Sequence, residues 1–280
     1  MIRTVFVLYK RPPVFPGGAR PAWVRGDELH AKDSARVHRE ALKNILRFLD
    51  GQPVRVRSSD RVNKTAIAGS DLLISVGGDG TFLELARAAN SQWILGVNSD
   101  PARSVGSFCP VSAVSFARFF KQTRMGRRKI LPLYRMGVVL NGRRIPIPVL
   151  NDLLITDQRP AAMSLYRLEI GRHKEEQRSS GLWIATAAGS TGAVRSAGGR
   201  VLPRGSRQIQ YRPRELYCQG QSASAHRLTG QVLAAGKTIR VGSLMRNGLL
   251  CFDGDHLQFP FRYGDRIEVM GGQSPLKCLI

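Results

Sequence analysis

In the first third of the chain, continuous hydrophobic runs take turns with segments in which hydrophobic residues recur at helical spacing. Residues 2–9 and 71–76 are nearly continuous apolar runs, which are typical of strands buried on both faces of a parallel sheet. Between these runs the apolar residues recur at helical spacing, and Asp33 or Ser34 is the expected N-cap of that helix. We predict strands at 2–9, 53–57, 71–76 and 93–97, a loop at 10–26, and helices at 34–49 and 81–89. This β-α-β-α-β order indicates an open parallel sheet.

The pattern changes after about residue 130, where short strand-like runs are separated by turn residues. The dipeptides Asn141-Gly142 and Asp253-Gly254 are strong hairpin signals because these residue types tolerate a positive φ. The expected strands are 130–140, 145–155, 164–170, 181–187, 238–241, 249–252, 256–261 and 265–270, and a helix is expected at 112–123. We therefore predict an α/β domain over residues 1–125 and an antiparallel β domain over residues 126–280.

Composition is typical of a soluble globular protein. Hydrophobic residues make up 42% and charged residues 22% of the chain, and no run approaches the roughly 18 apolar residues of a membrane helix. The apolar run at 2–9 is too short for a signal peptide. None of the four cysteines forms a C-x-x-C pair, and the five histidines lack metal-ligand spacing. We expect a cytoplasmic protein with reduced cysteines, no membrane partner and no metal site built from its own side chains.

The formal charge of +23, from 43 Lys+Arg against 20 Asp+Glu, suggests anionic partners. The basic residues are spread along the chain, and many are arginines, which suit bidentate contacts to phosphate. No zinc-finger, helix-turn-helix or RNP-type pattern is present. We therefore rank a solvated basic surface first, phosphate-bearing small ligands second and nucleic acid last.

The sharpest motif is Gly77-Gly78-Asp79-Gly80-Thr81, between a predicted buried strand and a predicted helix. Glycines let the backbone approach an anion closely, and a helix N-terminus offers free N–H groups. A carboxylate at this place would repel a phosphate unless it had another task, as a general base toward an alcohol or as a contact to a metal or sugar hydroxyl. The structural alternative is a tight turn with Asp79 as the N-cap.

Two further clusters lie in the second half of the chain. Asn151-Asp152 offers hydrogen-bond donors and acceptors together at the start of a strand, which suits a ribose or a base edge, and the alternative is a β-bulge or turn. The small and hydroxylated residues 186–192 leave room for a ligand against the backbone, and the alternative is a mobile loop. Ser196-Ala197-Gly198-Gly199 follows shortly afterwards.

In this order and spacing, the three clusters resemble the NAD kinase family, over roughly residues 1–270. That family is marked by a G-G-D-G-T-x-L loop, an N-E pair and a T-x-x-G-S-T segment that leads into S-A-G-G. The loop alone is shared with lipid kinases and phosphofructokinases, whereas the three together are specific. Residues 96–106 and 177–182 look like the NADH-kinase branch of the family.

The resemblance implies a fold and a reaction. The fold would be an N-terminal Rossmann-like parallel α/β domain and a C-terminal antiparallel β-sandwich, with the active site in the cleft between them. The reaction would transfer the γ-phosphate of ATP to the 2′-hydroxyl of the adenosine ribose of NAD⁺ or NADH. Mg²⁺, bound mainly through the phosphates, and a homodimer are implied as well.

The resemblance also assigns residues to tasks. Asp79 would be the catalytic base that accepts the proton of the 2′-hydroxyl. The other expected site residues bind the nucleotides, those of the glycine-rich loop lining the phosphates. They are Gly78, Gly80, Thr81, Asn98, Asp100, Asn151, Asp152, Arg178, Ser190, Thr191 and Ser196.

Three positions depart from the family pattern. Asp152 replaces the usual glutamate, Ser180 replaces an aspartate, and Ala193 replaces a tyrosine that would stack on the ligand. Two alternatives therefore stay open beside an active kinase. One is a dinucleotide-binding sensor with little or no activity, and the other is a lipid kinase that shares the G-G-D-G loop.

Overall fold

The computed structural model describes residues 2–11, 22–218 and 226–280, and the side chains of the first helix from Leu29 onward. The chain divides into two units, which are described separately. Unit 1 comprises Met1–Leu131 and Leu276–Ile280, and unit 2 comprises Pro132–Pro275. The sequence predicts a boundary after residue 125, whereas the structure places it after Leu131. The last residues return to unit 1 because the end of the final strand pairs with a strand of that unit.

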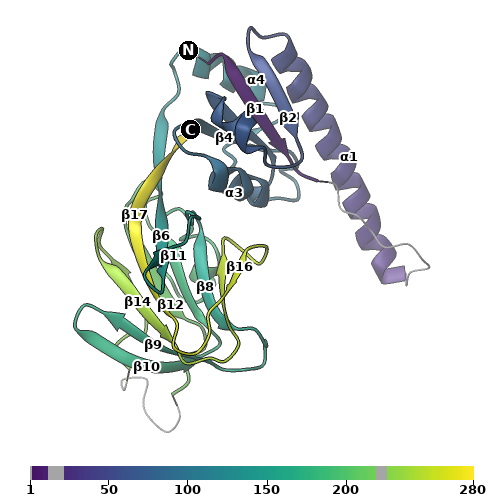
Figure 1. Cartoon of the computed structure of the whole chain (residues 1–280). Helices are drawn as coiled ribbons and strands as arrows, with labels where there is room; N and C mark the ends of the chain where they lie inside the picture. Colours follow the sequence, from purple (N-terminus) through teal and green to yellow (C-terminus); the bar gives the residue numbers. More distant parts are fainter. Residues whose placement is uncertain (1, 12–21, 219–225) are drawn as a thin grey trace. The chain divides into compact units, whose positions relative to one another are not determined.

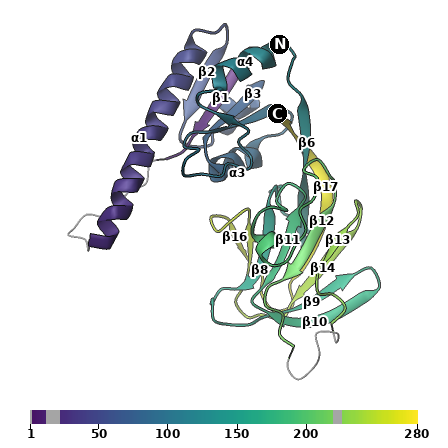
Figure 2. The same cartoon turned by 180° about the vertical axis from the view of Figure 1, so that it is seen from behind.

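Unit 1 is built on a parallel sheet with the strand order β2-β1-β3-β4 (Figures 1 and 2). The four strands expected from the sequence are confirmed within about two residues. The strands are β1 (Thr4–Tyr9), β2 (Arg55–Ser59), β3 (Leu72–Gly77), β4 (Trp93–Asn98) and β5 (Val111–Ser112). The helices are α1 (Ala22–Asp50), α2 (Lys64–Ala68), α3 (Asp79–Ala88) and α4 (Phe116–Arg124). The short α2 and β5 were not expected.

Helix α1 begins at Ala22, so the predicted start at Asp33 or Ser34 is wrong. Both residues lie inside the helix, and their side chains bond to other side chains instead of to the N–H groups of the first helical turn. Asp33 pairs with Arg36 and with Arg103, and Ser34 donates a hydrogen bond of 2.7 Å to Asp100. Residues 12–21 of the predicted loop lie outside the described residues, and the rest of it from Ala22 onward belongs to α1.

The strand order of unit 1 reverses between β1 and β3. In open α/β sheets, ligands bind beyond the carboxyl ends of the strands at such a switch point. The backbone N–H of Lys10 bonds to the carbonyl of Val76 at 2.9 Å, so the pairing of β1 and β3 continues to this edge. The turn from β3 into α3 therefore lies at the place where the fold favours a ligand.

The strand β3 is buried along its whole length, so both faces of the sheet are covered there, as the continuous apolar run predicts. Val7, Ile74 and Val97 are fully buried in the three central strands, and they pack in one cluster with Leu49 of α1 and Phe120 of α4. Burying each of these side chains stabilises the fold by roughly 1.5–3 kcal/mol. This packing holds the strand ends, and with them the turn after β3, in fixed positions.

Unit 2 contains antiparallel strands in two layers (Figures 1 and 2). One layer has the order β10-β9-β14-β17, with β6 beside β17 and β7 beside β6, and the other has the order β13-β12-β11-β8-β15-β16. The elements are β6 (Ile130–Leu140), β7 (Arg143–Arg144), β8 (Asp152–Asp157), β9 (Ser164–Ile170), β10 (His173–Ser179), β11 (Leu182–Thr186), α5 (Ala193–Ser196), β12 (Ile209–Pro213), β13 (Gln231–Leu233), β14 (Thr238–Ser243), β15 (Gly248–Phe252), β16 (Gln258–Pro260) and β17 (Arg266–Leu279).

One apolar core lies between the two layers of unit 2. Tyr166 and Leu168 enter it from β9, and Ile184 and Tyr211 enter it from β11 and β12. Buried and half-buried residues alternate along β9, as expected for a strand with one face in a core. A sandwich is therefore the architecture of unit 2, in agreement with the prediction.

The sequence does not predict β5, β7, β10, β12 and β13, of which β10 is the most polar of the longer strands. β10 has the sequence His-Lys-Glu-Glu-Gln-Arg-Ser and lies at the edge of its sheet, where most of its side chains face water. The predicted strand 145–155 is replaced by an isolated bridge at Val149 and by β8, which begins at Asp152. The two hairpin signals are confirmed, since Asn141 and Asp253 both have a φ of 49°.

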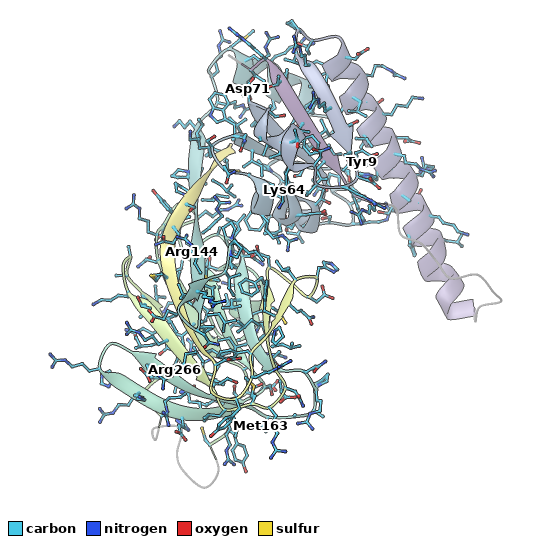
Figure 3. All side chains as sticks on the ribbon, viewed as in Figure 1. Tyr9, Lys64, Asp71, Arg144, Met163 and Arg266 are labelled. Carbon is cyan, nitrogen blue, oxygen red and sulfur yellow. The ribbon has the colours of Figure 1, made fainter. Side chains whose placement is uncertain are left out.

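The basic residues are distributed over the surfaces of both units (Figure 3). Charged side chains extend from both units, and Arg144 and Arg266 are exposed examples on unit 2 (Figure 3). Among the helices of the described residues, none is long and apolar enough to cross a membrane.

Candidate active site

Asp79 is the first residue of α3, and Gly78 occupies the N-cap position before it. The alternative in which Asp79 itself caps the helix is therefore wrong. Gly78 has no side chain to bond the free N–H groups of the first helical turn, so these groups remain available to an anion. The turn places uncapped N–H groups of a helix beside a carboxylate, which is the arrangement that the sequence motif predicts.

The half-buried carboxylate of Asp79 is aimed by two backbone groups. Its Oδ2 accepts a hydrogen bond of 2.9 Å from the N–H of Ser107, and its Oδ1 accepts one of 2.7 Å from the N–H of Phe108. Both donors belong to the loop that follows β4. Because each oxygen is engaged by a backbone group, the carboxylate has one orientation rather than several.

That loop is itself held in place by packing. The ring of Phe108 stacks on Phe82 of α3 with 5.2 Å between centroids and 4° between planes. Its carbonyl oxygen lies against Gly96 of β4, where a Cβ atom would come within 2.3 Å of it. Only glycine at position 96 permits this approach, so the packing of β4 sets the position of the N–H groups that hold Asp79.

The glycines of the turn have different tasks. A Cβ on Gly77 would lie 2.4 Å from the hydroxyl of Thr81, and one on Gly78 would lie 2.9 Å from the hydroxyl of Ser104. A side chain at Gly77 would therefore crowd Thr81, whereas one at Gly78 would require only the Ser104 hydroxyl to move. Gly80 is exposed, and in the described part of the chain no atom lies within 4 Å of its would-be Cβ. The space beside Gly80 stays open.

Asn98 and Asp100 lie next to the turn, because β3 and β4 are neighbours and Gly77 pairs with Asn98. Their polar groups already have partners within unit 1. Asn98 donates to the carbonyl of Ser104 at 2.9 Å and accepts from the N–H of Asp100 at 3.0 Å. Asp100 also accepts bonds from Ser34 and Arg103. Both residues organise the loop that aims Asp79, and a direct nucleotide contact by either stays a prediction.

His38 is a buried polar residue beside this loop that the sequence does not single out. Its Nδ1 lies 2.9 Å from the hydroxyl of Ser99. Burial, and next the positive charge of Lys10, lower the pKa of His38, so the ring is neutral at neutral pH. A single histidine in a helical pattern carries no local signal for such a contact.

In unit 2, Asn151 and Asp152 lie at the start of β8 and are held by Asp253. The N–H of Asn151 donates to Asp253 at 2.6 Å, and its side-chain amide donates to Asp152 at 3.2 Å. The N–H of Asp253 bonds in turn to the carbonyl of Asp152 at 2.9 Å. The sequence identifies Asp253 only as a hairpin residue, so its second role is a finding of the structure.

Asp152 is 4% exposed and lies beside the charge of Asp253. Burial, and next this negative charge, raise the pKa of Asp152 to about 7. Arg135 is also buried nearby, and desolvation lowers its pKa to about 10 while the charge of Asp253 acts in the opposite direction. At neutral pH the carboxyl of Asp152 is therefore protonated in a substantial fraction of molecules.

Residues 186–192 form a folded loop over Asn151, so the alternative of a mobile glycine- and serine-rich loop is not favoured. The N–H of Thr186 donates to the carbonyl of Asn151 at 3.0 Å. A Cβ on Gly189 would lie 2.1 Å from that same oxygen. The buried Ser190 hydroxyl donates to Ala187 at 2.7 Å and accepts from Leu202 at 2.9 Å, which closes the loop onto the chain that follows.

The remaining predicted residues are exposed. Thr191 and Ser196 lie in or just after the same loop, and their side chains face outward. Arg178 lies on β10, where its carbonyl accepts from the N–H of Tyr217 at 2.9 Å. Within the described residues, no hydrogen bond joins Arg178 to Asn151 or Asp152. Among the residues that the structure describes, no three or more His, Cys, Asp or Glu side chains are grouped so that they could hold a metal ion.

Comparison with known proteins identifies relatives over most of the chain. No protein-family model matches it. It is 36% identical over 273 residues to a probable NADH kinase of Oryza sativa subsp. japonica, covering 89% of this chain and 83% of that protein. It is 32% identical over 276 residues to the NADH kinase of Arabidopsis thaliana, covering 90% and 86%.

Two solved structures share the fold. An NAD kinase from Archaeoglobus fulgidus in complex with ATP matches with a TM-score of 0.68 at 21% identity, over 98% of this chain and 92% of the other. Yeast NADH kinase complexed with NADH matches with a TM-score of 0.76 at 17% identity, over 99% and 83%. These two structural similarities establish the architecture. The plant relatives establish common descent, because they are more than 30% identical to this chain over most of both lengths. The chain belongs to the NAD kinase family.

Proposed function

We propose that this NAD(H) kinase transfers the γ-phosphate of ATP to the 2′-hydroxyl of the adenosine ribose of NAD⁺ or NADH, with Asp79 as the general base. The observation that carries this proposal is the carboxylate of Asp79, which opens α3 and is aimed by the N–H groups of Ser107 and Phe108. The names of the plant relatives support a dinucleotide acceptor, and the ATP complex of the archaeal relative supports the donor.

A hydroxyl that attacks phosphorus must lose its proton, and Asp79 is suited to accept it. Each carboxylate oxygen can accept two hydrogen bonds, and each accepts one from the backbone loop. A ribose hydroxyl can therefore bond to Asp79 without displacing the groups that aim it. General base catalysis of this kind contributes roughly 10²- to 10⁴-fold to the rate.

The N-terminus of α3 supplies the anion site for the phosphates. The first N–H groups of the helix lack a capping side chain, and the open space beside Gly80 lets an oxygen approach the backbone. Mg²⁺ would supply further neutralisation of phosphate charge, held through the phosphates rather than by a cluster of protein ligands. The proposal assigns Gly78, Gly80 and Thr81 to the phosphates.

In unit 2, Asn151 and Asp152 are assigned to the adenosine. A carboxyl whose pKa is raised to about 7 can donate as well as accept a hydrogen bond near neutral pH, and it repels a phosphate less than a full charge does. Thr191, Ser196 and Arg178 are assigned to the rest of the dinucleotide because their side chains are exposed. Ser190 holds the loop that carries Thr191.

We also propose a homodimer, which the family resemblance implies, and a cytoplasmic location, which the four scattered cysteines without a C-x-x-C pair favour. Sedimentation equilibrium of the purified protein measures the oligomeric state, and fractionation of the source cells measures the compartment. A monomer at all concentrations would remove the homodimer without affecting the proposed reaction.

The reaction is tested by incubating the purified protein with MgATP and either NAD⁺ or NADH and by separating the products chromatographically. We expect NADP⁺ or NADPH to form, and the ratio of the two rates to define the preferred acceptor. Absence of product with both acceptors, while ATP and NAD(H) still bind, would overturn the proposal in favour of a dinucleotide-binding sensor.

A further inference from the structure

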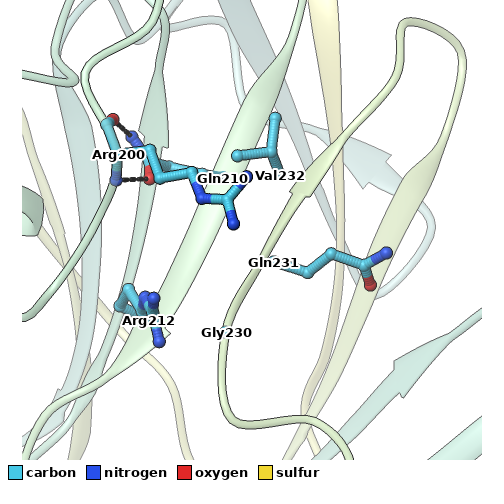
Figure 4. Close-up of a pocket in the computed structure, with 6 residues that line it drawn as sticks. All are labelled: Arg200, Gln210, Arg212, Gly230, Gln231 and Val232. Atoms are coloured by element: carbon cyan, nitrogen blue, oxygen red, sulfur yellow. Dashed lines mark hydrogen bonds between the residues drawn. The ribbon is translucent and has the colours of Figure 1, made fainter.

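Unit 2 contains a cavity of about 310 Å³ that none of the residues assigned to the kinase reaction lines. It lies beside β12 and β13 and is lined by Arg200, Gln210, Arg212, Gly230, Gln231 and Val232 (Figure 4). Its volume is at the lower end of the range for sites that bind small molecules. Two arginine side chains line this small cavity although their positive charges repel each other, so the contacts that hold them there are informative.

Arg212 is placed in the cavity wall by a close approach to Gly230. A Cβ on Gly230 would lie 2.3 Å from the Cδ of Arg212, and Gly230 has a φ of +136°, which other residues rarely adopt. One guanidinium nitrogen donates to the carbonyl of Thr229 at 3.2 Å. The side chain of Arg212 is thus held at Cδ and at one guanidinium nitrogen, and the guanidinium group retains further N–H donors.

Arg200 is placed by the buried side chain of Gln210. Gln210 is 2% exposed, accepts a bond of 2.8 Å from the N–H of Arg200 and donates one of 2.7 Å to its carbonyl (Figure 4). A Cβ on Gly199 would come within 2.9 Å of the Gln210 oxygen, so glycine lets the chain close over this amide. The backbone of Arg200 is therefore anchored, while its side chain is exposed.

The charges of these two arginines are not balanced by nearby carboxylates. Among the described residues, no carboxylate lies within ion-pair distance of Arg200 or Arg212, whereas Arg36, Arg103 and Arg167 each pair with one. Among the described residues that line the cavity, Val232 is the only apolar side chain and none is aromatic, whereas the polar groups are two guanidinium groups and two amides. The cavity favours a compact anion over a nucleobase.

We propose that this cavity is a second anion site, built for a compact phosphate or diphosphate group and separate from the kinase centre. Arg200 and Arg212 present planar forks that suit bidentate contacts to phosphate oxygens. A bound dianion would relieve the repulsion between them. The ligand is either a free anion or the diphosphate part of a nucleotide, since both have this chemistry.

The test is calorimetric titration of the full chain with inorganic pyrophosphate, for the unaltered protein and for Arg200→Gln and Arg212→Gln. We expect each substitution to weaken one class of binding site by roughly tenfold or more, because charge-assisted hydrogen bonds are lost. Arg143→Gln is the matched control, since Arg143 is an exposed arginine of unit 2 outside the cavity. The rate of NADH phosphorylation is expected to stay unchanged in all three variants.

Equal weakening by Arg143→Gln would overturn the proposal, because the effect would then be one of general charge. Unchanged pyrophosphate binding in Arg200→Gln would overturn it as well. Arg200 is exposed, so this variant is expected to keep its unfolding temperature, which excludes misfolding as the cause of a loss. Loss of kinase activity together with pyrophosphate binding would overturn the separation from the kinase centre.

A titration with ADP distinguishes the two sources of the ligand. Competition by ADP for the sites that Arg200→Gln removes supports a nucleotide diphosphate as the occupant. Binding of pyrophosphate that ADP leaves undisturbed supports a free anion.

Discussion

Asp79 Oδ1 accepts a hydrogen bond of 2.7 Å from the backbone N–H of Phe108, twenty-nine residues further along the chain. The position of that N–H depends in turn on the stacking of Phe108 on Phe82 and on the close approach to Gly96. The proposed base is therefore aimed by the loop after β4 rather than by its own turn. Substitutions in the loop after β4 are therefore expected to affect catalysis, as substitutions of Asp79 itself are.

Substituting Asp79 by asparagine should remove catalysis and keep the fold. An amide has nearly the same shape, but it cannot take the proton of the ribose hydroxyl, and its NH₂ group would face one of the two backbone donors. We expect kcat to fall by roughly 10²- to 10⁴-fold, as for loss of a general base. Steady-state kinetics with ATP and NADH, together with calorimetric binding of ATP, measure the effect. Wild-type turnover in this variant would exclude Asp79 as the base.

Substituting Gly106 by alanine should disturb the loop that aims Asp79. Gly106 has a φ of +60°, and its Cβ would lie 2.5 Å from the amide nitrogen of Asn98. We expect a loss of stability of about 1–2 kcal/mol from the left-handed backbone alone, and a fall in kcat because the N–H groups of Ser107 and Phe108 shift. Chemical denaturation and kinetic assays of the same preparation measure both.

Gly126 provides the control for that experiment. It also lies in unit 1 with a positive φ, +68°, but its would-be Cβ meets open space. Gly126→Ala should therefore show the backbone cost without the loss of kcat. An equal fall in kcat in both variants would contradict a specific role of the Gly106 loop.

The stability of unit 2 should depend on pH through Asp152. Its folded-state pKa is raised from 3.8 to about 7, so the native state holds a proton that the unfolded state releases. Stability is then highest below the unfolded pKa, falls as the pH rises toward 7, and is constant above it. Asp152→Asn should remove this pH dependence, which amounts to a total change in the free energy of unfolding of about 4 kcal/mol. Denaturation at a series of pH values between 4 and 8 measures the slope.

The same substitution at Asp255 separates this effect from a general change of charge. Asp255 lies in the adjacent hairpin, and its side chain is 83% exposed. Asp255→Asn should leave the pH dependence of stability as it is in the unaltered protein. An unchanged slope in Asp152→Asn would mean that Asp152 is not the group responsible.

Substituting Gly189 by alanine should break the packing of the loop on Asn151. The added Cβ would lie 2.1 Å from the carbonyl oxygen of Asn151, in backbone that cannot move without disturbing β8. We expect a loss of stability at the upper end of overpacking, about 3 kcal/mol, and weaker binding of the dinucleotide. Gly192→Ala in the same loop, with its nearest contact at 3.2 Å, should cost far less. Thermal unfolding and NADH titration of both variants distinguish the two, and equal effects would contradict the packing argument.

Much of the fold follows from local pattern. The strands of unit 1 are buried on both faces and therefore appear as continuous apolar runs, and β9 appears as a strand because its residues alternate. Strands without either pattern, such as β10, are not recognisable, because an edge strand can be polar along most of its length. The start of α1 is also missed, since Asp33 and Ser34 have cap-forming side chains that bond to other elements.

The amino-acid sequence by itself determined the alternation of the main strands and helices in unit 1, the turn from β3 into α3 and the presence of a carboxylate at a helix N-terminus. These depend on residues that are neighbours along the chain. Only the tertiary structure decided what holds the carboxylates. Ser107 and Phe108 reach Asp79 across 28 and 29 residues, and Asp253 reaches Asn151 across 102. Such pairs arise when strands pack side by side, and a local pattern of residue types does not specify which distant backbone group will fill a given position.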